Sequence, residues 1–574
     1  MTIYIIDTEF GYRDELEVRG NLKPICACLV NLETGEEHPF WNDSFDDLRR
    51  FINDNLDCLF VAHNMTSEVR VLKHLSVPIP NLWYCTFISY RWLSNRRIGK
   101  RDKSIPPASL VAALEHFGEA HEDPIGKREL QERLGKLQYH PSERERILRY
   151  CLQDCHATAT LFRHLRRQGA PCERSWTEYA KAVVDIEDEG LLIDERALGE
   201  IVGSARRLRD LLVAKGNHEY PFFDANGSLN AAQTLDWVRQ RSKSWCGALT
   251  KKGALSLADK SLEKLATRFP EIENVRQIKA SISLLKNAGL KASRGRSYFS
   301  VVPFRTITGR NAPSDFLFAK PKWCRFLVIP EPGHILLGVD YDAQEFGIAA
   351  ALSGDKAMLD AYWDGDPHIG FAIRTGACPR GATKETHPAM RKRYKETNLA
   401  ILYGKTIPAT ALMLGTSQAA AAKLYAEHQR LFPTFWDWSA RVKSKIRRTG
   451  EMWSSLGWRA KTKFSSPRSK LNFAMQATGA DIMRLSIVYL RQLGVRVLAP
   501  IHDGFLLTCR MDEHDDTVKR IDLAFDKACR QALGGRTLRW TVSAPYTQRY
   551  VDEDGQEMWD LLCSGSKEIG ALAL

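Results

Sequence analysis

Residues 334–352, HILLGVDYDAQEFGIAAAL, carry the pattern on which the interpretation of the rest of the chain depends. A short apolar run leads through Val339 to the acid Asp340, and an apolar helical run begins near Glu345. This pattern is typical of a buried strand that places one carboxylate at the mouth of a cleft. A single Asp at a strand end more often caps the next helix, so Asp340 alone does not indicate an active site.

A second acid stands in a comparable position within residues 495–508, VRVLAPIHDGFLLT. Two apolar, β-rich runs flank His502, Asp503 and Gly504, which predicts a hairpin with Asp503 at its tip. Such a hairpin can set Asp503 beside Asp340 on one sheet. Two adjacent carboxylates repel each other, and divalent cations between them relieve the repulsion. We therefore expect a two-metal site for in-line phosphoryl transfer, with ions roughly 3.5–4 Å apart.

A third stretch, RKRYKETNLAILYGK at 391–405, lies between the two acids. At about 100° per residue, four of its side chains follow one helical face: Arg391, Lys395, Leu399 and Tyr403. The ordinary interpretation is a solvated basic helix with the Leu and Tyr packed inward. Together with the two acids, the face is also typical of a wall that grips a triphosphate and covers a base pair.

These stretches resemble motifs A, B and C of the family A DNA polymerases, which include bacterial DNA polymerase I and many phage replicases. The matching residues are Asp340-Tyr341 with Glu345 for motif A, Arg391, Lys395 and Tyr403-Gly404 for motif B, and His502-Asp503 for motif C. The resemblance implies that Asp340 and Asp503 hold two Mg²⁺ ions, for which Mn²⁺ can substitute. The partners it implies are primer-template DNA and dNTPs, with processivity or replisome proteins as further candidates.

The resemblance also implies roles around the incoming nucleotide. Arg391 and Lys395 would neutralise the triphosphate, with Lys395 placed to protonate the leaving group. Tyr403 would stack at the insertion site. Leu399 stands where an aromatic residue usually contacts the sugar, so discrimination at that position is hard to predict.

Two further positions match nucleotide contacts of the family. Glu345 matches the steric gate, whose carboxylate occupies the space that a 2'-OH would need and thereby favours deoxynucleotides. His368 matches a histidine near the triphosphate. The acid before it, Asp366, is also an ordinary helix cap.

Several residues match positions that contact DNA. Residues 298–312, SYFSVVPFRTITGRN, predict strands followed by Thr308-Gly309-Arg310, and the family places this arginine in the minor groove near the primer end. His502 is expected to support the primer end. The helical stretch RSKLNFAMQATGADIMR adds three matches at or near the template side: Arg468, Asn472 and Gln476.

The N-terminal region carries a separate set of acids. Ile3 to Ile6 predict a strand that ends in Asp7-Thr8-Glu9, with both carboxylates on one face. Solvated acids at a strand end are the commoner outcome of such a pattern. However, four acids and a tyrosine suffice to bind two metals and orient a water against a phosphodiester. The five residues are Asp7, Glu9, Glu68, Asp154 and Tyr150.

This set resembles the DnaQ-like 3'-5' exonuclease domain fused to family A polymerases, with an RNase H-like fold.

Besides Leu399, three residues depart from the patterns of the polymerase and exonuclease families. Glu68 stands where an Asp is usual, Asp342 replaces a Ser in motif A, and Gly504 replaces the Glu after His502-Asp503. We expect proofreading to be retained, because the first and third exonuclease motifs are intact. We expect polymerase activity to be lowered or altered at most.

The resemblance covers almost the whole chain and implies an α/β and α+β multidomain fold. An RNase H-like exonuclease domain would be followed by a right-hand polymerase domain. The expected parts are the exonuclease domain at 1–170, a thumb at 171–300, a first palm segment at 301–352, fingers at 353–465 and a second palm segment at 466–574. No segment matches the 5' nuclease of the bacterial enzyme, which suggests a compact and plausibly phage-encoded replicase.

Composition is consistent with this interpretation. The 574 residues carry a formal charge of +13, which favours an anionic partner, although many proteins share that property. Thirteen cysteines are scattered without a CxxC spacing, which indicates reduced thiols and no zinc site. The chain shows no charged leader and no long apolar run. We therefore expect a protein of the bacterial or phage-infected cytosol, without a membrane partner.

The sequence thus predicts a template-directed DNA polymerase with 3'-5' proofreading that serves DNA replication. One alternative is a 3'-5' exonuclease whose degenerate polymerase half only clamps DNA. Another is a non-catalytic DNA-binding scaffold, which would leave the metal-site acids without a purpose. An RNA polymerase is disfavoured by Glu345 and by the exonuclease pattern.

Overall fold

The computed structural model describes residues 1–12, 22–96, 106–119, 124–220, 222–242, 249–250, 253–266, 268–286, 292–463 and 467–572, with the side chains of 124–128, 467–469 and 566–572 left out. The chain divides into two compact units. The first holds Met1–Glu189, Ser300–Ser314 and Gly338–Ser543, and the second holds Gly190–Phe299, Asp315–Leu337 and Ala544–Leu574. The expected mixed α/β multidomain class is confirmed. These units are coarser than the five expected parts, so that division stays a prediction.

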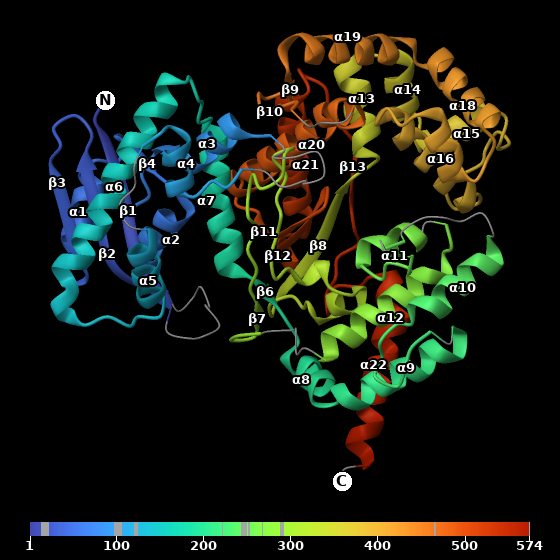
Figure 1. The fold of residues 1–574 in the computed structure, drawn as a ribbon, viewed down its shortest axis with the longest axis horizontal. Helices are drawn as coiled ribbons and strands as arrows, with labels where there is room; N and C mark the ends of the chain where they lie inside the picture. The colour runs from blue at the N-terminus through green and yellow to red at the C-terminus, as the bar shows by residue number, and fades with distance from the viewer. Residues whose placement is uncertain are drawn as a thin grey trace. The chain divides into compact units, whose positions relative to one another are not determined.

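A mixed sheet with the order β3-β2-β1-β4-β5 opens the first unit (Figure 1). Its strands are β1 (Ile3–Tyr12), β2 (Leu22–Asn31), β3 (Glu37–Trp41), β4 (Leu59–Ala62) and β5 (Leu82–Cys85). β1 pairs antiparallel with β2 and parallel with β4. Helix α6 (Arg144–Arg167) packs across β1 and β2. The other helices of this region are α1 (Phe45–Asp54), α2 (Thr66–His74), α3 (Thr86–Ser94), α4 (Leu110–His116), α5 (Pro124–Gly135) and α7 (Arg174–Glu189).

A second sheet, with the order β11-β12-β8-β13, belongs mainly to the first unit and holds Asp340 and the hairpin around Asp503. Its strands are β8 (His334–Tyr341), β11 (Arg496–Ile501), β12 (Gly504–Arg510) and β13 (Trp540–Val542). Apolar residues of β8, β11 and β12 are buried almost throughout, which a sheet covered by helices requires. Helices α20 (Pro467–Gln492) and α21 (His514–Ala532) pack against each other beside it.

A helical region follows β8 in the chain and is coloured yellow to orange in Figure 1. It consists of α13 (Gln344–Ser353), α14 (Lys356–Trp363), α15 (Pro367–Arg374), α16 (Pro388–Leu402), α17 (Ile407–Leu414), α18 (Gln418–Leu431) and α19 (Pro433–Thr449). A small hairpin of β9 (Glu451–Trp453) and β10 (Arg459–Lys461) leads back towards α20. This region supplies the basic helix α16 of the candidate site.

The second unit is mainly helical. Its elements are α8 (Glu195–Gly203), α9 (Ala205–Glu219), α10 (Ala231–Arg241), α11 (Asp259–Ala266), α12 (Glu271–Lys286) and α22 (Glu553–Leu572), with the short strands β6 (Leu191–Leu192) and β7 (Arg296–Ser297). Across the described part of the chain, no helix combines the length and the apolar composition of a membrane span.

Residues 298–305 do not form the predicted strands, and this prediction is wrong. In this described segment Ser300 forms an isolated bridge with Ser314, and the Val302 carbonyl oxygen accepts from the Ala312 N–H at 3.2 Å. Val302 and Phe304 have positive φ angles of 46° and 56°. Extended strands require negative φ, so the backbone here cannot continue a regular ladder.

The Thr308-Gly309-Arg310 turn that follows is anchored from two sides. Trp458 Nε1 donates to the Ile307 carbonyl oxygen at 3.0 Å, and Arg484 Nη1 donates to the Gly309 carbonyl oxygen at 2.7 Å. Gly309 has a φ of +72°, and a Cβ there would stand 3.0 Å from Trp458 Nε1. Glycine is therefore required both by conformation and by space.

Replacing Arg484 by Met should strongly destabilise the first unit. Arg484 is buried and paired with the equally buried Asp481, so its loss leaves an uncompensated charge and an unpaired Gly309 carbonyl. The expected cost is about 3–5 kcal/mol in the free energy of unfolding. Urea unfolding followed by circular dichroism measures it, and Arg491→Met, at a more exposed pair, serves as the control. Equal unfolding midpoints for the two variants would contradict this expectation.

Candidate active sites

Asp340 and Asp503 come from neighbouring parts of the second sheet. Asp340 stands near the end of β8, and Asp503 lies in the two-residue loop between β11 and β12, so the predicted hairpin is confirmed. β12 is next to β8 in the sheet order. A Cβ at Gly504 would stand 2.6 Å from the Val339 carbonyl oxygen and 2.9 Å from Asp340 Oδ1. The hairpin can approach Asp340 this closely because Gly504 has no side chain.

The charges around Asp340 favour a bound cation. Asp340 is exposed near the end of the inner strand β8 but crowded by protein on its other sides. This partial burial is the main cause that raises its pKa to about 6, and the charges of Asp503 and Asp342 add to the effect, while Lys395 opposes it. A divalent cation would relieve the repulsion among these acids. Carboxylate oxygens are the ligands that Mg²⁺ and Mn²⁺ prefer, so the donor set fits either ion.

Asp342, the acid that departs from the family pattern, is held in place by its neighbours. Thr541 Oγ1 donates to Asp342 Oδ1 at 2.9 Å, and the Tyr362 hydroxyl donates to its carbonyl oxygen at 2.8 Å. Asp342 is therefore an ordered acid whose charge acts on Asp340. Its contribution to the site could not be assigned from the sequence, because Thr541 lies far along the chain.

Helix α16 brings basic residues towards Asp340. Lys395 is exposed, and its charge lowers the pKa of Asp340 against the larger opposing effects. Arg391 Nε donates to Asp366 Oδ2 at 2.7 Å. Tyr403 directly follows the last helical residue as the C-cap. The helix predicted for this stretch is confirmed, and the roles of its side chains stay predictions.

Asp366 and His368 both contact other protein groups at the start of α15. Asp366 caps α15 by accepting from the backbone N–H groups of His368 and Ile369, at 2.9 and 3.1 Å. The His368 ring is only 2% exposed, and its Nδ1 lies 3.0 Å from Nδ2 of Asn398. Burial lowers the pKa of His368 to about 4, so the ring is neutral near pH 7. This contact joins α15 to α16, and a contact of His368 with a triphosphate stays a prediction.

Two predicted residues from distant stretches, Tyr403 and Arg310, contact Glu345. The Tyr403 hydroxyl donates to Glu345 Oε2, and Arg310 Nη2 lies 3.8 Å from Glu345 Oε1. Burial, followed by the charge of Glu345, raises the pKa of Tyr403, while a hydrogen bond with Gln476 lowers it. Motif A, motif B, the Thr308-Gly309-Arg310 turn and α20 therefore converge on one cluster.

The remaining residues predicted to contact DNA or the nucleotide lie on α20, on α16 and at the hairpin tip. Asn472 lies one helical turn before Gln476 on α20, and within the described residues its Oδ1 has no hydrogen-bond partner. His502 is exposed at the hairpin tip with a φ of 57°. Leu399 is half-buried on α16. Arg468 lies outside the residues whose side chains are described.

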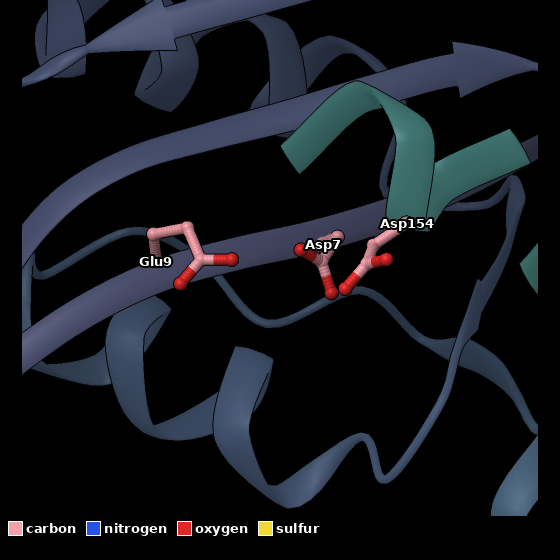
Figure 2. Close-up of side chains that lie close together, drawn as sticks. All are labelled: Asp7, Glu9 and Asp154. Atoms are coloured by element: carbon pink, nitrogen blue, oxygen red, sulfur yellow. The ribbon is translucent and has the colours of Figure 1, made fainter. Parts of the chain in front are cut away.

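Three acids of the predicted exonuclease site come together in the N-terminal region. Asp7 and Glu9 project from β1, and Asp154 projects from α6 with its carboxylate towards Asp7 (Figure 2). One carboxylate oxygen from each of the three lies within 4.8 Å of the others. Their positions follow from the alternation of side chains along β1 and from the packing of α6 across that strand.

Glu68 and Tyr150 complete this acidic cluster. Glu68 is 3% exposed, and within the described residues its Oε2 has no hydrogen-bond partner. Burial and then the charge of Asp7 raise its pKa well above the ordinary range. Burial, with the charges of Glu9, Asp154 and Asp7, likewise raises the pKa of Tyr150, so its hydroxyl keeps its proton. A buried carboxylate oxygen without a partner beside further acids fits a bound divalent cation.

A cleft of about 820 Å³ opens onto these acids. His63 lines it, with Nδ1 3.0 Å from Thr86 Oγ1 and Nε2 2.9 Å from the Ala108 carbonyl oxygen. Sequence reasoning missed four residues that line the same cleft from a distant segment: Ser300, Val302, Pro303 and Arg305. No local pattern could have found them, because only the folded chain brings this segment to the exonuclease region.

Comparison with known proteins identifies the family. The sequence model of DNA polymerase family A matches residues 232–534, more than half of the chain. The chain therefore belongs to DNA polymerase family A. The matched range includes the candidate polymerase site and ends before β13; it does not include the N-terminal sheet.

Individual relatives agree with this family. The DNA polymerase of Mycobacterium phage D29 is 28% identical over 218 residues, which cover 37% of this chain and 35% of the relative. The thermostable DNA polymerase I of Thermus thermophilus is 25% identical over 384 residues, which cover 61% of this chain and 45% of the relative. The chain thus spans less than half the length of these curated relatives.

The fold is shared along nearly the whole chain with one solved structure, the POL domain of Pol1 from M. smegmatis in complex with DNA primer-template and dNTP. The two chains superpose with a TM-score of 0.70 over 95% of each, at 16% sequence identity. This likeness concerns the fold, and it includes the region before residue 232 that the family model does not match.

In the metal-free protein, replacing Asp340 by Asn should raise thermal stability at high pH. The pKa of Asp340 in the folded protein is about 6, above its ordinary value of 3.8. Ionisation of this residue therefore opposes folding above about pH 6 and has no such effect below about pH 4. The gain from Asn should be largest above pH 6 and disappear towards pH 4.

Thermal unfolding midpoints in EDTA, recorded between about pH 4 and pH 8, measure this gain. The control is Asp437→Asn, at an exposed acid on α19. Mg²⁺ should raise the midpoint of the wild-type protein more than that of Asp340→Asn. A gain that does not change with pH would contradict the expectation.

Proposed function

We propose that this protein is a template-directed DNA polymerase that adds dNTPs to a primer 3'-OH, with a 3'-5' proofreading exonuclease. The observation that carries the proposal is the meeting of Asp340 and Asp503 on one sheet, with the basic helix α16 facing them. Membership of DNA polymerase family A supports it. The formal charge of +13 suits an anionic partner such as primer-template DNA.

In this proposal the polymerase site works through positioned charges. Asp340 and Asp503 would hold two Mg²⁺ ions, which when bound make the primer 3'-OH a better nucleophile and offset the charge of the leaving pyrophosphate. Lys395 carries the proton that the leaving group needs, and Arg391 contributes further positive charge for the triphosphate. Arg391 donates to Asp366, and a contact with the triphosphate would replace this carboxylate partner by a phosphate.

The proposed nucleotide specificity rests on the cluster around Glu345. Tyr403 and Arg310 both contact this carboxylate, which limits its freedom to move away from the space beside the sugar. A fixed carboxylate there would leave no room for a 2'-OH. Gln476 and Asn472 on α20 would contact the base-pair edges on the other side of the nucleotide.

The exonuclease part of the proposal rests on the N-terminal cluster. Asp7, Glu9, Glu68 and Asp154 would hold the metal ions, which when bound make a water nucleophilic towards the terminal phosphodiester. Tyr150 keeps its proton and can donate a hydrogen bond to that water or to the phosphate. Within the described residues the buried Oε2 of Glu68 has no hydrogen-bond partner, which supports retention of activity despite the longer side chain.

We also propose a role in phage genome replication. Similarity to the mycobacteriophage polymerases supports this role, although bacterial polymerases are similar to a comparable degree.

Primer extension with matched and mismatched 3' ends should separate the two activities. Asp503→Ala should lower nucleotide incorporation at least about 1,000-fold, because the remaining acid cannot hold both ions. It should leave removal of a mismatched end intact. Asp7→Ala should extend matched primers normally and fail to remove mismatches. Thermal unfolding of both variants controls for folding.

Each outcome bears on a different part of the proposal. Normal extension by Asp503→Ala would refute the polymerase site, and mismatch removal by Asp7→Ala would refute the exonuclease site. If the wild-type protein removes nucleotides but never adds them, the protein is a 3'-5' exonuclease whose second half clamps DNA.

Replacing Glu345 by Ala should relax sugar selection. The open space beside the sugar would admit ribonucleotides, so the preference for dCTP over CTP should fall by about 100-fold or more. Single-nucleotide insertion kinetics with each nucleotide measure the ratio. Glu427→Ala, at an acid on α18, is the control and should leave the preference unchanged. Unaltered selection in Glu345→Ala would show that another residue is the gate.

A further inference from the structure

An irregular segment from the polymerase part of the sequence lines the exonuclease cleft. We call residues 300–310 the strap. Its first half contributes four residues to the cleft wall, opposite the acids of β1 and α6: Ser300, Val302, Pro303 and Arg305. Its second half forms the turn that carries Arg310, which lies 3.8 Å from Glu345. One short segment therefore joins the two candidate active sites.

The conformation of the strap is held by a buried arginine of the N-terminal region. Arg91 on α3 donates from Nη2 to the Arg305 carbonyl oxygen at 2.7 Å and to the Phe304 carbonyl oxygen at 3.5 Å. Its Nη1 donates to the Pro106 carbonyl oxygen at 2.9 Å. The positive φ angles of Val302 and Phe304 are thus imposed by tertiary contacts, which is usual for strained backbone near functional sites. The result is a defined position for Arg305.

Asn95 anchors the second half of the strap. Its Nδ2 donates to the Ile307 carbonyl oxygen at 2.7 Å and to the Arg459 carbonyl oxygen at the same distance. The N-terminal region therefore holds the strap at two points, one at the carbonyl groups of Phe304 and Arg305 and one at Ile307. A side chain on such a fixed backbone loses little further backbone entropy when it binds a ligand.

The charges in the cleft distinguish Arg305 from the other arginine of its wall. Arg70 is buried and paired with Glu187 and Asp188, each at 2.6 Å. Arg305 is exposed, and no side-chain ion pair is found for it in the described part of the chain. Burial, with a smaller contribution from the charge of Arg305, lowers the pKa of Arg91 to about 10.

Arg305 is thus an exposed guanidinium group on the cleft wall, and such a group is suited to bind an anion. The acids Asp7, Glu9, Glu68 and Asp154 line the same cleft, so an anionic chain that enters it needs a compensating cation at some distance from its reacting end. We propose that Arg305 binds a backbone phosphate of the single-stranded 3' end that occupies this cleft. This inference rests on the proposed exonuclease function and adds a binding residue from the polymerase part of the sequence.

The experiment measures 3' removal from a single-stranded oligonucleotide by wild type, Arg305→Ala, Arg305→Lys and Asp7→Ala. Arg167→Ala is the matched control, since it removes an exposed arginine at the far end of α6 from the same region. For Arg305→Ala we expect KM to rise about tenfold, because one charge-assisted contact is lost at a distance from the reacting bond. The turnover number should change little, and Arg305→Lys should recover most of the loss.

Salt dependence provides a readout that a purely structural role would not change. The slope of log KM against log salt should be smaller by about 0.7 in Arg305→Ala, the value of one phosphate contact on a single strand. Oligonucleotides with a single neutral methylphosphonate add a position-specific test. One position should weaken binding to the wild-type protein and have no effect on Arg305→Ala.

The outcomes separate the inference from the proposed function. If Arg305→Ala matches wild type and Arg167→Ala in KM and in salt slope, while Asp7→Ala is inactive, the phosphate contact is refuted and the exonuclease stands. If Arg305→Ala lowers turnover and thermal stability with an unchanged salt slope, the residue is structural and the inference is also refuted. If wild type removes no nucleotides, or Asp7→Ala still removes them, the proposed function fails and the inference fails with it.

Discussion

The close approach of β12 to β8 at Gly504 is the constraint on which the candidate polymerase site depends. It holds the hairpin tip against Asp340, and the partial burial of Asp340 makes the repulsion with Asp503 and Asp342 stronger. Such an arrangement opposes folding in the absence of cations. The buried apolar strands beneath it compensate, which is the usual relation between a strained functional site and its scaffold.

The N-terminal cluster brings acids together in a different environment. There Glu68 and Asp154 are buried, whereas Asp340 is exposed near the end of β8. The N-terminal acids and Asp340 project from regular strands and helices, which can hold a metal-binding geometry more firmly than loops can. Asp503 lies in the short loop between β11 and β12, and the close approach at Gly504 holds that loop against β8.

The departures from the family patterns have unequal explanations. Gly504 is a steric consequence of the approach to Val339. Asp342 is supported by Thr541, so its charge is an ordered part of the site. Glu68 reaches the acidic cluster from α2 and keeps one oxygen available. Nothing in the structure explains Leu399.

The sequence by itself determined the strand before Asp340, the hairpin around Asp503, the basic helix α16 and the strand that bears Asp7 and Glu9. Periodicity and turn chemistry are local properties, so these elements could be predicted from short windows. Only the tertiary structure decided that His368 is buried against Asn398, that residues 298–305 are irregular and that Arg305 lines the exonuclease cleft. These features depend on packing between segments far apart in the chain, and no local pattern contains that information.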